Sequence, residues 1–269
     1  MSFLDGIIKA ENGLTDRAKL DLGDNYMLSR DLLESMPFIL SFSNDNDVSH
    51  IFDSQIIKDF YLAVLNIVRR HSLITNLILR HAIESIVLFA YSMEHKKEDE
   101  YVIKRNETDI LDFKEKLLTE KAYKHMELKY PEYSKNLEGY KDTINVHYSH
   151  ANIFSAQYNS AIIDGNLKLL IFDDYFDEHI RDTLCIINDI ICITLRLYKI
   201  LVYEYKSFVL IPDFDKKFEE YLIRHSKNLE DNIEKNKEKN LPKNELIDKI
   251  FMRLEKKYNI KDDIGKKKK

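Results

Sequence analysis

Apolar side chains recur every three or four residues along most of this chain, which is the spacing of one helix face. The densest apolar stretch, 55–93, is longer than an ordinary globular helix, and the polar run Arg69-Arg70-His71-Ser72 divides it. The pattern therefore predicts two antiparallel helices, at about 55–70 and 72–94. The second is apolar nearly all round, which is typical of a helix in the centre of a bundle.

Another strongly apolar helix is predicted at about 177–205, where two stripes of apolar side chains require neighbours on two sides. Weaker helical patterns cover much of the remaining chain. Pro131 and Pro242 separate the later ones, because proline disfavours helical backbone in the residue before it. These weaker helices are predicted at about 15–22, 29–40, 106–129, 132–156, 214–240 and 243–258.

Only one segment has a convincing strand pattern. Between about 160 and 172, two apolar runs flank Asp164-Gly165, a pair that tolerates the positive φ of a tight hairpin turn. The six glycines and four prolines of the chain are too few for the many turns of an all-β fold. The predicted fold class is mainly α: a multi-helix bundle with one inserted β-hairpin (about 160–172) and charged C-terminal helices.

The net charge of −5 is unevenly distributed. Residues 215–269 hold 17 Lys and Arg against 12 Asp and Glu, so the remainder of the chain carries a net −10. We predict a helical bundle domain over 1–213, with its core at about 55–205, and a charged helical tail over 214–269 with a lysine-rich end. The acidic body is a poor platform for a polyanion, whereas the tail could bind RNA, DNA or an acidic partner, or simply keep the chain in solution.

The location is predicted to be cytoplasmic, without membrane contact. No basic segment precedes the first apolar residues, as it would in a secretory signal. The apolar stretch 85–93 is too short to cross a membrane, and charges interrupt 184–202. Cys185 and Cys192 lie two helical turns apart and cannot form a disulfide within that helix, which fits a reducing compartment.

Several enzyme signatures are missing from the sequence. It contains no glycine-rich phosphate loop, Cys-x-x-Cys, His-Glu-x-x-His or Gly-x-Ser-x-Gly. Kinases, dinucleotide-binding enzymes, zincins and α/β-hydrolases are therefore disfavoured, and no cofactor is expected.

The first candidate for chemistry is Arg80 with Glu84 on the helix at 72–94. The two residues are four apart, so they are neighbours on one face and can pair. If that face is buried, each charge needs the other or another partner. The alternative is a surface ion pair, which contributes at most about 0.5 kcal/mol.

The second candidate lies on the helix at 132–156. At about 100° per residue, Tyr140, Ile144 and His147 line one apolar stripe, with His150 at its edge. They suit either hydrogen-bonded core residues or general acid–base groups. A zinc site would need more ligands than His147 and His150, and none is indicated, so no metal is expected. The candidate catalytic set is therefore Arg80, Glu84, Tyr140, His147 and His150.

These two places together resemble a family of uncharacterised bacterial helical domains, over roughly 55–205. Its members pair a helix reading Arg-x-x-x-Glu with a later helix reading Tyr and then His with small polar residues; here these are Arg80, Glu84, Tyr140, and either His147 or His150. Such domains are similar to HEPN-like bundles, a class that includes ribonuclease toxins, phage-defence proteins and non-catalytic partners. In its nucleases, an Arg shortly before a His, brought together across a dimer, cleaves RNA without metal.

The sequence departs from that nuclease pattern. Asn145, Ile144 and Thr143 stand where the Arg should precede His150. Cleavage would require Arg80 to stabilise the phosphorane charge from another helix while a histidine activates the ribose 2′-hydroxyl.

Two functions therefore stay open. One is an HEPN-like protein of bacterial defence or stress response that binds or cleaves RNA. The other is a non-enzymatic helical interaction or dimerisation module, in which buried polar groups fix the register of the helices. The partners expected are RNA, a second copy of the chain, or a protein bound through the C-terminal helices.

Overall fold

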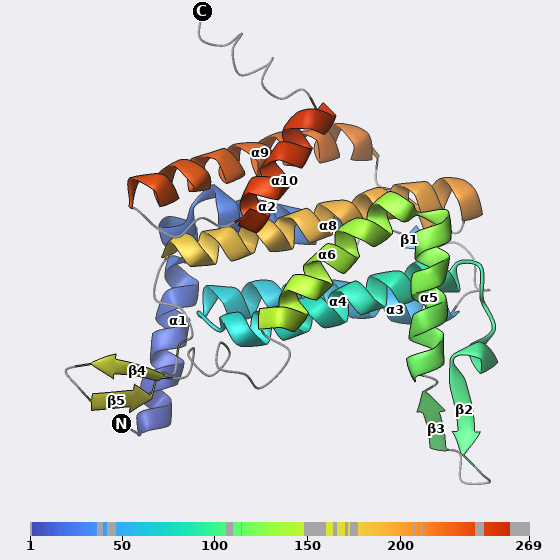
Figure 1. Ribbon diagram of the computed structural model, residues 1–269, viewed down its shortest axis with the longest axis horizontal. Helices are drawn as coiled ribbons and strands as arrows, with labels where there is room; N and C mark the ends of the chain where they lie inside the picture. Colours follow the sequence, from blue (N-terminus) through green and yellow to red (C-terminus); the bar gives the residue numbers. More distant parts are fainter. Residues whose placement is uncertain are drawn as a thin grey trace, which may run out of the picture.

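Nine α-helices form most of the described part of the chain, which is a computed structural model (Figure 1). The structure describes residues 2–36, 40–41, 47–105, 110–113, 115–147, 160–163, 166–169, 172, 177–206, 208–210, 212–239 and 245–258. The helices are α1 (Phe3–Leu22), α2 (Asp24–Ser35), α3 (Asp47–Val68), α4 (Ser72–Ser92), α5 (Glu115–Lys129), α6 (Pro131–His147), α8 (Asp177–Tyr205), α9 (Phe214–Glu238) and α10 (Glu245–Tyr258), with a 3₁₀ turn, η2 (Glu98–Glu100). The mainly helical class predicted from the sequence is confirmed.

The finer fold class, with a single inserted β-hairpin, is corrected. The described β structure is divided among three two-stranded antiparallel pairs. They join β1 (Leu40–Ser41) to β6 (Phe208–Val209), β2 (Val102–Arg105) to β3 (Ile110–Phe113), and β4 (Ser160–Ile163) to β5 (Asn166–Leu169). The two-residue strands β1 and β6 are too short to show an alternating pattern, and no turn pair such as Asp-Gly stands between β2 and β3, so these two pairs leave no clear signal in the sequence. The β2–β3 and β4–β5 pairs lie at the edge of the helical core (Figure 1).

The α3–α4 hairpin forms one side of the bundle and confirms the two antiparallel helices predicted there. The chain reverses at Arg70, whose φ of 67° is the left-handed conformation of a tight corner. Helix α3 begins at Asp47, earlier than the predicted start near residue 55. The polar residues just before 55 therefore belong to the helix. One of them, Asp53, is buried and accepts a hydrogen bond of 2.6 Å from the Tyr198 hydroxyl of α8.

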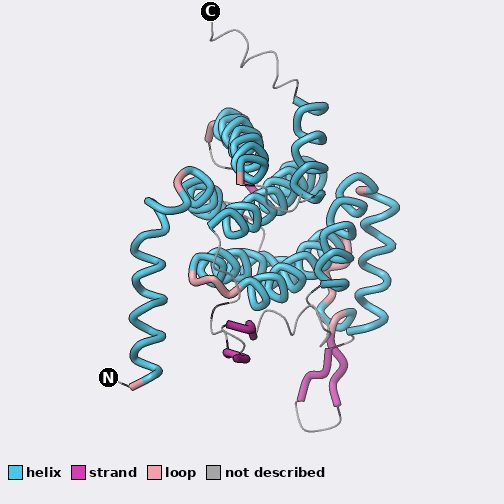
Figure 2. The backbone as a smooth tube through the Cα atoms, turned by 60° about the vertical axis from the view of Figure 1, so that its left-hand side comes forward, coloured by secondary structure: helices cyan, strands magenta, loops and turns pink. Residues whose placement is uncertain are grey.

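Helix α8 runs through the centre, with α3 and α4 on one side and α2 and α9 on the other (Figures 1 and 2). Its two predicted apolar stripes explain this position. Ile187 and Ile191 on one stripe and Ile190 on the other are all fully buried. Helix α1, by contrast, extends beyond the bundle, and its Leu4 and Leu20 are exposed.

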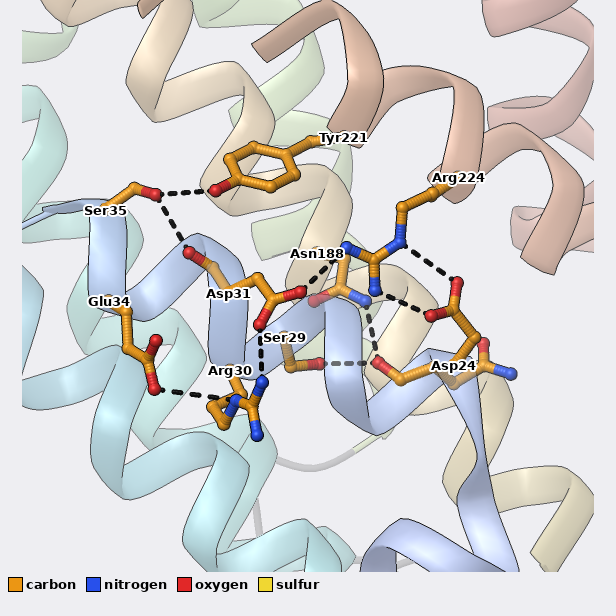
Figure 3. A network of polar contacts seen from close by, with 10 residues as sticks. Asp24, Ser29, Arg30, Asp31, Glu34, Ser35, Asn188, Tyr221 and Arg224 are labelled. Atoms are coloured by element: carbon orange, nitrogen blue, oxygen red, sulfur yellow. Dashed lines mark hydrogen bonds and ion pairs between the residues drawn. The ribbon is translucent and has the colours of Figure 1, made fainter. Parts of the chain in front are cut away.

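The C-terminal helices α9 and α10 are found close to the ranges predicted for them, and they pack on α8. Leu222, Leu229 and Leu254 from these helices belong to the same apolar core as the rest of the bundle. Polar contacts also hold α9: Figure 3 shows Arg224 reaching across to α2, where it pairs with Asp24 at 2.6 Å and Asp31 at 2.7 Å. The division of the chain into a bundle domain over 1–213 and a charged tail over 214–269 stays a prediction.

The helix predicted at 106–129 is shorter than expected. Helix α5 begins at Glu115, and Ile110–Phe113 forms a strand instead. The strand pairs with β2, so a contact with a neighbouring segment outweighs the helical pattern there. Helix α6 ends at His147, and the remainder of the predicted 132–156 helix lies outside the described residues.

Among the described residues, one helix is long and apolar enough to cross a membrane by length and composition alone: α4. This helix is longer than the apolar stretch at 85–93 that the sequence indicated. More than half of its most apolar window (56%) is buried inside the bundle, which is consistent with the core helix of a soluble protein.

Candidate functional site

Arg80 and Glu84 form the pair that their spacing predicts, but at the surface. The Arg80 Nε lies 3.4 Å from Glu84 Oε1, and the two side chains remain 36% and 30% exposed. The face of α4 that carries this ion pair is therefore not fully buried, as it would have to be for each charge to depend on the other. This geometry matches the alternative of a surface ion pair, which by itself contributes little to stability.

Lys141, next to Tyr140 on α6, connects this pair to two other helices. Its Nζ lies 3.0 Å from Glu84 Oε1 and donates to the Tyr123 hydroxyl of α5, also at 3.0 Å. Burial disfavours the charged ammonium, but Tyr123 and Glu84 outweigh it and raise the pKa of Lys141. The side chain of Lys141 thus joins α6 to both α4 and α5.

Tyr140 is buried and points elsewhere, into a polar network around Asp189 of α8. Its hydroxyl donates to Asp189 Oδ2 at 2.5 Å. Arg253 of α10 pairs with the same oxygen, and the His225 Nε2 of α9 lies 3.5 Å from Asp189 Oδ1. One carboxylate in the centre of the bundle thus brings together side chains from α6, α9 and α10.

The charges of this network explain how a carboxylate can stay ionised inside the protein. Burial favours the neutral acid, but His225 and Arg253 outweigh it and hold the pKa of Asp189 well below its usual range. Burial and the adjacent Asp189 raise the pKa of Tyr140, so its phenol stays protonated as a donor. A buried carboxylate held by Tyr140 and Arg253 in this way links α8 to α6 and α10 and fixes their relative positions.

The candidate catalytic residues are therefore not gathered in one place within the described part of the chain. Arg80 and Glu84 lie at the surface of α4, and Tyr140 makes its contacts with Asp189 and Arg253. His147 ends α6, and only its backbone is described. His150 lies outside the described residues. The catalytic roles of all five residues stay predictions.

A feature that the sequence did not reveal is an apolar surface on the outside of the α3–α4 hairpin. Five large apolar side chains near its corner are between 36% and 46% exposed. Helix α8 packs on both helices, yet these five side chains remain exposed. We call this surface the α3–α4 face; it consists of Tyr61, Leu62, Leu65, Ile74 and Leu77. The apolar pattern all round α4 predicted a helix enclosed on every side. On one side of α4, however, the apolar residues Ile74 and Leu77 belong to this exposed face.

Comparisons of this chain with protein-family models, with curated proteins and with solved structures found no match. The similarity to HEPN-like bundles accordingly rests on the residues quoted from the sequence alone.

Proposed function

We propose that this protein is a non-enzymatic helical interaction module that associates with a second copy of itself through the α3–α4 face. The observation that carries the proposal is the group of large apolar side chains left in water on two neighbouring helices. Burying apolar surface gains about 25 cal/mol per Å², and contiguous exposed apolar patches commonly mark interaction sites.

A second copy fits this surface better than an unrelated partner. Two helical hairpins that meet face to face form a four-helix arrangement around a twofold axis, with the same residues on both sides. The rim carries both signs of charge: His81 pairs with Asp59 at 2.7 Å beside the Arg80–Glu84 pair. Two copies therefore do not repel one another at the contact, despite the net charge of −5.

A cytoplasmic location is part of the proposal. Both cysteines of the chain, Cys185 and Cys192, are free and buried, as is usual where thiols stay reduced. A further protein partner on the C-terminal helices remains an expectation from their charge.

The oligomeric state tests the proposal. Analytical ultracentrifugation of the full chain over a range of concentrations is expected to show a dimer in equilibrium with the monomer. Leu65→Glu and Leu77→Glu each place a charge in the centre of the α3–α4 face and should yield a folded monomer. Leu20→Glu, an exposed leucine of α1, is the matched control and should leave the dimer intact. A wild type that is monomeric at about 100 µM, well above the dissociation constant of a specific contact, would reject the proposal, as would a dimer that survives both substitutions.

The second candidate is an HEPN-like protein of bacterial defence or stress response that binds or cleaves RNA. The observation in its favour is that the Arg80 guanidinium is partly exposed and adjoins the α3–α4 face, one turn after Leu77. Self-association would therefore bring two Arg80 side chains to the rim of one interface, and α6, which ends at His147, is tied across α4 by Glu84 and Lys141.

RNA incubated with the purified protein in EDTA tests this second candidate. Cleavage that is lost in both Arg80→Ala and His150→Ala would support it. Arg17→Ala is the control, since Arg17 forms a similar ion pair with Asp21 four residues on. If the RNA stays intact, or if His150→Ala leaves cleavage unchanged, the hypothesis of RNA cleavage is rejected.

A further inference from the structure

Two histidines and a glutamate meet where α4 ends and α5 passes alongside it. Glu94 and His95 follow the last turn of α4, and His125 lies in the middle of α5. One ligand atom from each of the three lies within 4.8 Å of the others. Zn²⁺ ligands at about 2.0–2.1 Å in a tetrahedron are roughly 3.4 Å apart, so modest side-chain rotations would bring these atoms onto one ion.

The His95 ring is held in place from several directions. Its Nδ1 lies 3.0 Å from Glu100 Oε2, and the ring stacks on Tyr91 with 4.0 Å between centroids. The Tyr101 hydroxyl donates to the His95 carbonyl oxygen at 2.6 Å. A carboxylate on one imidazole nitrogen orients the ring and leaves the other nitrogen for a metal, as in carboxylate–histidine–zinc arrangements.

His125 supplies a nitrogen that has no other use. Its side chain is only 13% exposed, and its buried Nε2 has no hydrogen-bond partner in the described structure. A buried polar atom without a partner is rare in a folded protein and needs an explanation.

Glu94 opens the group to solvent and supplies negative charge. Its side chain is partly exposed; Oε1 accepts from Lys129 Nζ at 2.7 Å, while Oε2 lies 3.4 Å from His125 Nδ1. Glu100 lies on the other side, and Glu204 lies 3.6 Å from the same Lys129 ammonium. Three carboxylates against one ammonium favour a cation here.

We propose that Glu94, His95 and His125 bind one divalent transition-metal ion, with Zn²⁺ the ion that suits them best. Two imidazoles and one carboxylate leave a fourth position for water, and the exposure of Glu94 provides the entry path. The ion fastens α5 to the end of α4. The site is independent of the α3–α4 face, since it lies at the opposite end of α4 from Ile74 and Leu77.

Zinc titration of the tag-free, EDTA-treated full chain tests the proposal, with calorimetry for stoichiometry and Co²⁺ absorption spectra for the ligand geometry. One tight ion per chain is expected, with a higher melting temperature when it is bound. His95→Ala and Glu94→Gln should each weaken binding at least tenfold, and Glu100→Gln should weaken it by roughly 10–100-fold through the orientation of His95. Lys129→Met should tighten binding, because it removes the ammonium that competes for Glu94.

His81→Ala is the matched control, since His81 also pairs with a carboxylate but belongs to no such group within the described part of the chain. It should leave the affinity unchanged. The proposal is overturned if no saturable one-to-one binding is found, or if Glu94→Gln and His95→Ala bind as tightly as the wild type.

Discussion

Replacing Asp189 with alanine is expected to destabilise the protein by about 3–4 kcal/mol, because three helices lose their common acceptor. Tyr140 is buried, so its hydroxyl is left without a partner at a cost of roughly 1–3 kcal/mol. Arg253 also loses its counter-ion, which costs about 3–5 kcal/mol for a fully buried pair. Its side chain is 26% exposed, however, and can turn toward water, so the total stays near the lower end of that range.

Urea denaturation followed by circular dichroism measures the effect. For a slope of roughly 3 kcal/mol per M, the midpoint should fall by about 1 M. The exposed Asp142 of α6 is the control, and Asp142→Ala should change stability by less than about 0.5 kcal/mol. A double-mutant cycle of Asp189→Ala with Tyr140→Phe should show coupling, since the two side chains are in contact.

The same substitution has a distinctive pH dependence. The folded pKa of Asp189 is depressed, so its contribution is fully present above the unfolded value of about 3.9 and is lost as the pH falls through the folded pKa. The stability difference between wild type and Asp189→Ala should therefore be constant from pH 7 to 5 and shrink below about pH 4. A loss under 1 kcal/mol at pH 7, or one no larger than that of Asp142→Ala, would show that the network does not hold the helices.

The remaining predictions concern three other buried or interfacial groups. Asp53 should behave in the opposite way to Asp189. Burial raises the pKa of Asp53, so its ionisation opposes folding as the pH rises above about 4. In urea titrations, Asp53→Asn should therefore stabilise the protein more at pH 7 than at pH 4. Leu229→Ala should cost about 2–5 kcal/mol, since this α9 side chain is fully buried in the common core; a loss below 1 kcal/mol would show that α9 is loosely attached. Arg224→Met should cost about 1 kcal/mol through Asp24 and Asp31, and the more exposed Arg30→Met less than half of that, both measured as shifts in the urea midpoint.

The helices were the part of the fold that could be predicted, because their signal is local. The corner at Arg70, the central helix α8 and the two C-terminal helices follow from apolar spacing and proline positions. The pairs β1–β6 and β2–β3 could not be predicted. The pair of β1 with β6 joins Leu40 to Val209, and two residues carry no period that would reveal a partner so far along the chain.

The candidate site was predicted only where its contacts are local. The spacing of Arg80 and Glu84 predicted their ion pair, but not that it would lie at the surface. The apolar stripe predicted at 132–156 singled out Tyr140 as a core or acid–base group, whereas no pattern in the sequence singled out Asp189. Its partners come from three other helices, so no spacing within one segment connects them.

By itself, the sequence determined most of the helical segments, where α3 turns into α4, and which faces of the long helices are apolar, since these depend on neighbours within a few turns. Only the tertiary structure decided which polar groups are enclosed and which apolar ones are left in water. Burial depends on what packs against each face: the same helix α4 contributes to the core near Ile86 and exposes Leu77 to solvent, and the carboxylate of Asp189 keeps its charge because Arg253 arrives from the far end of the chain.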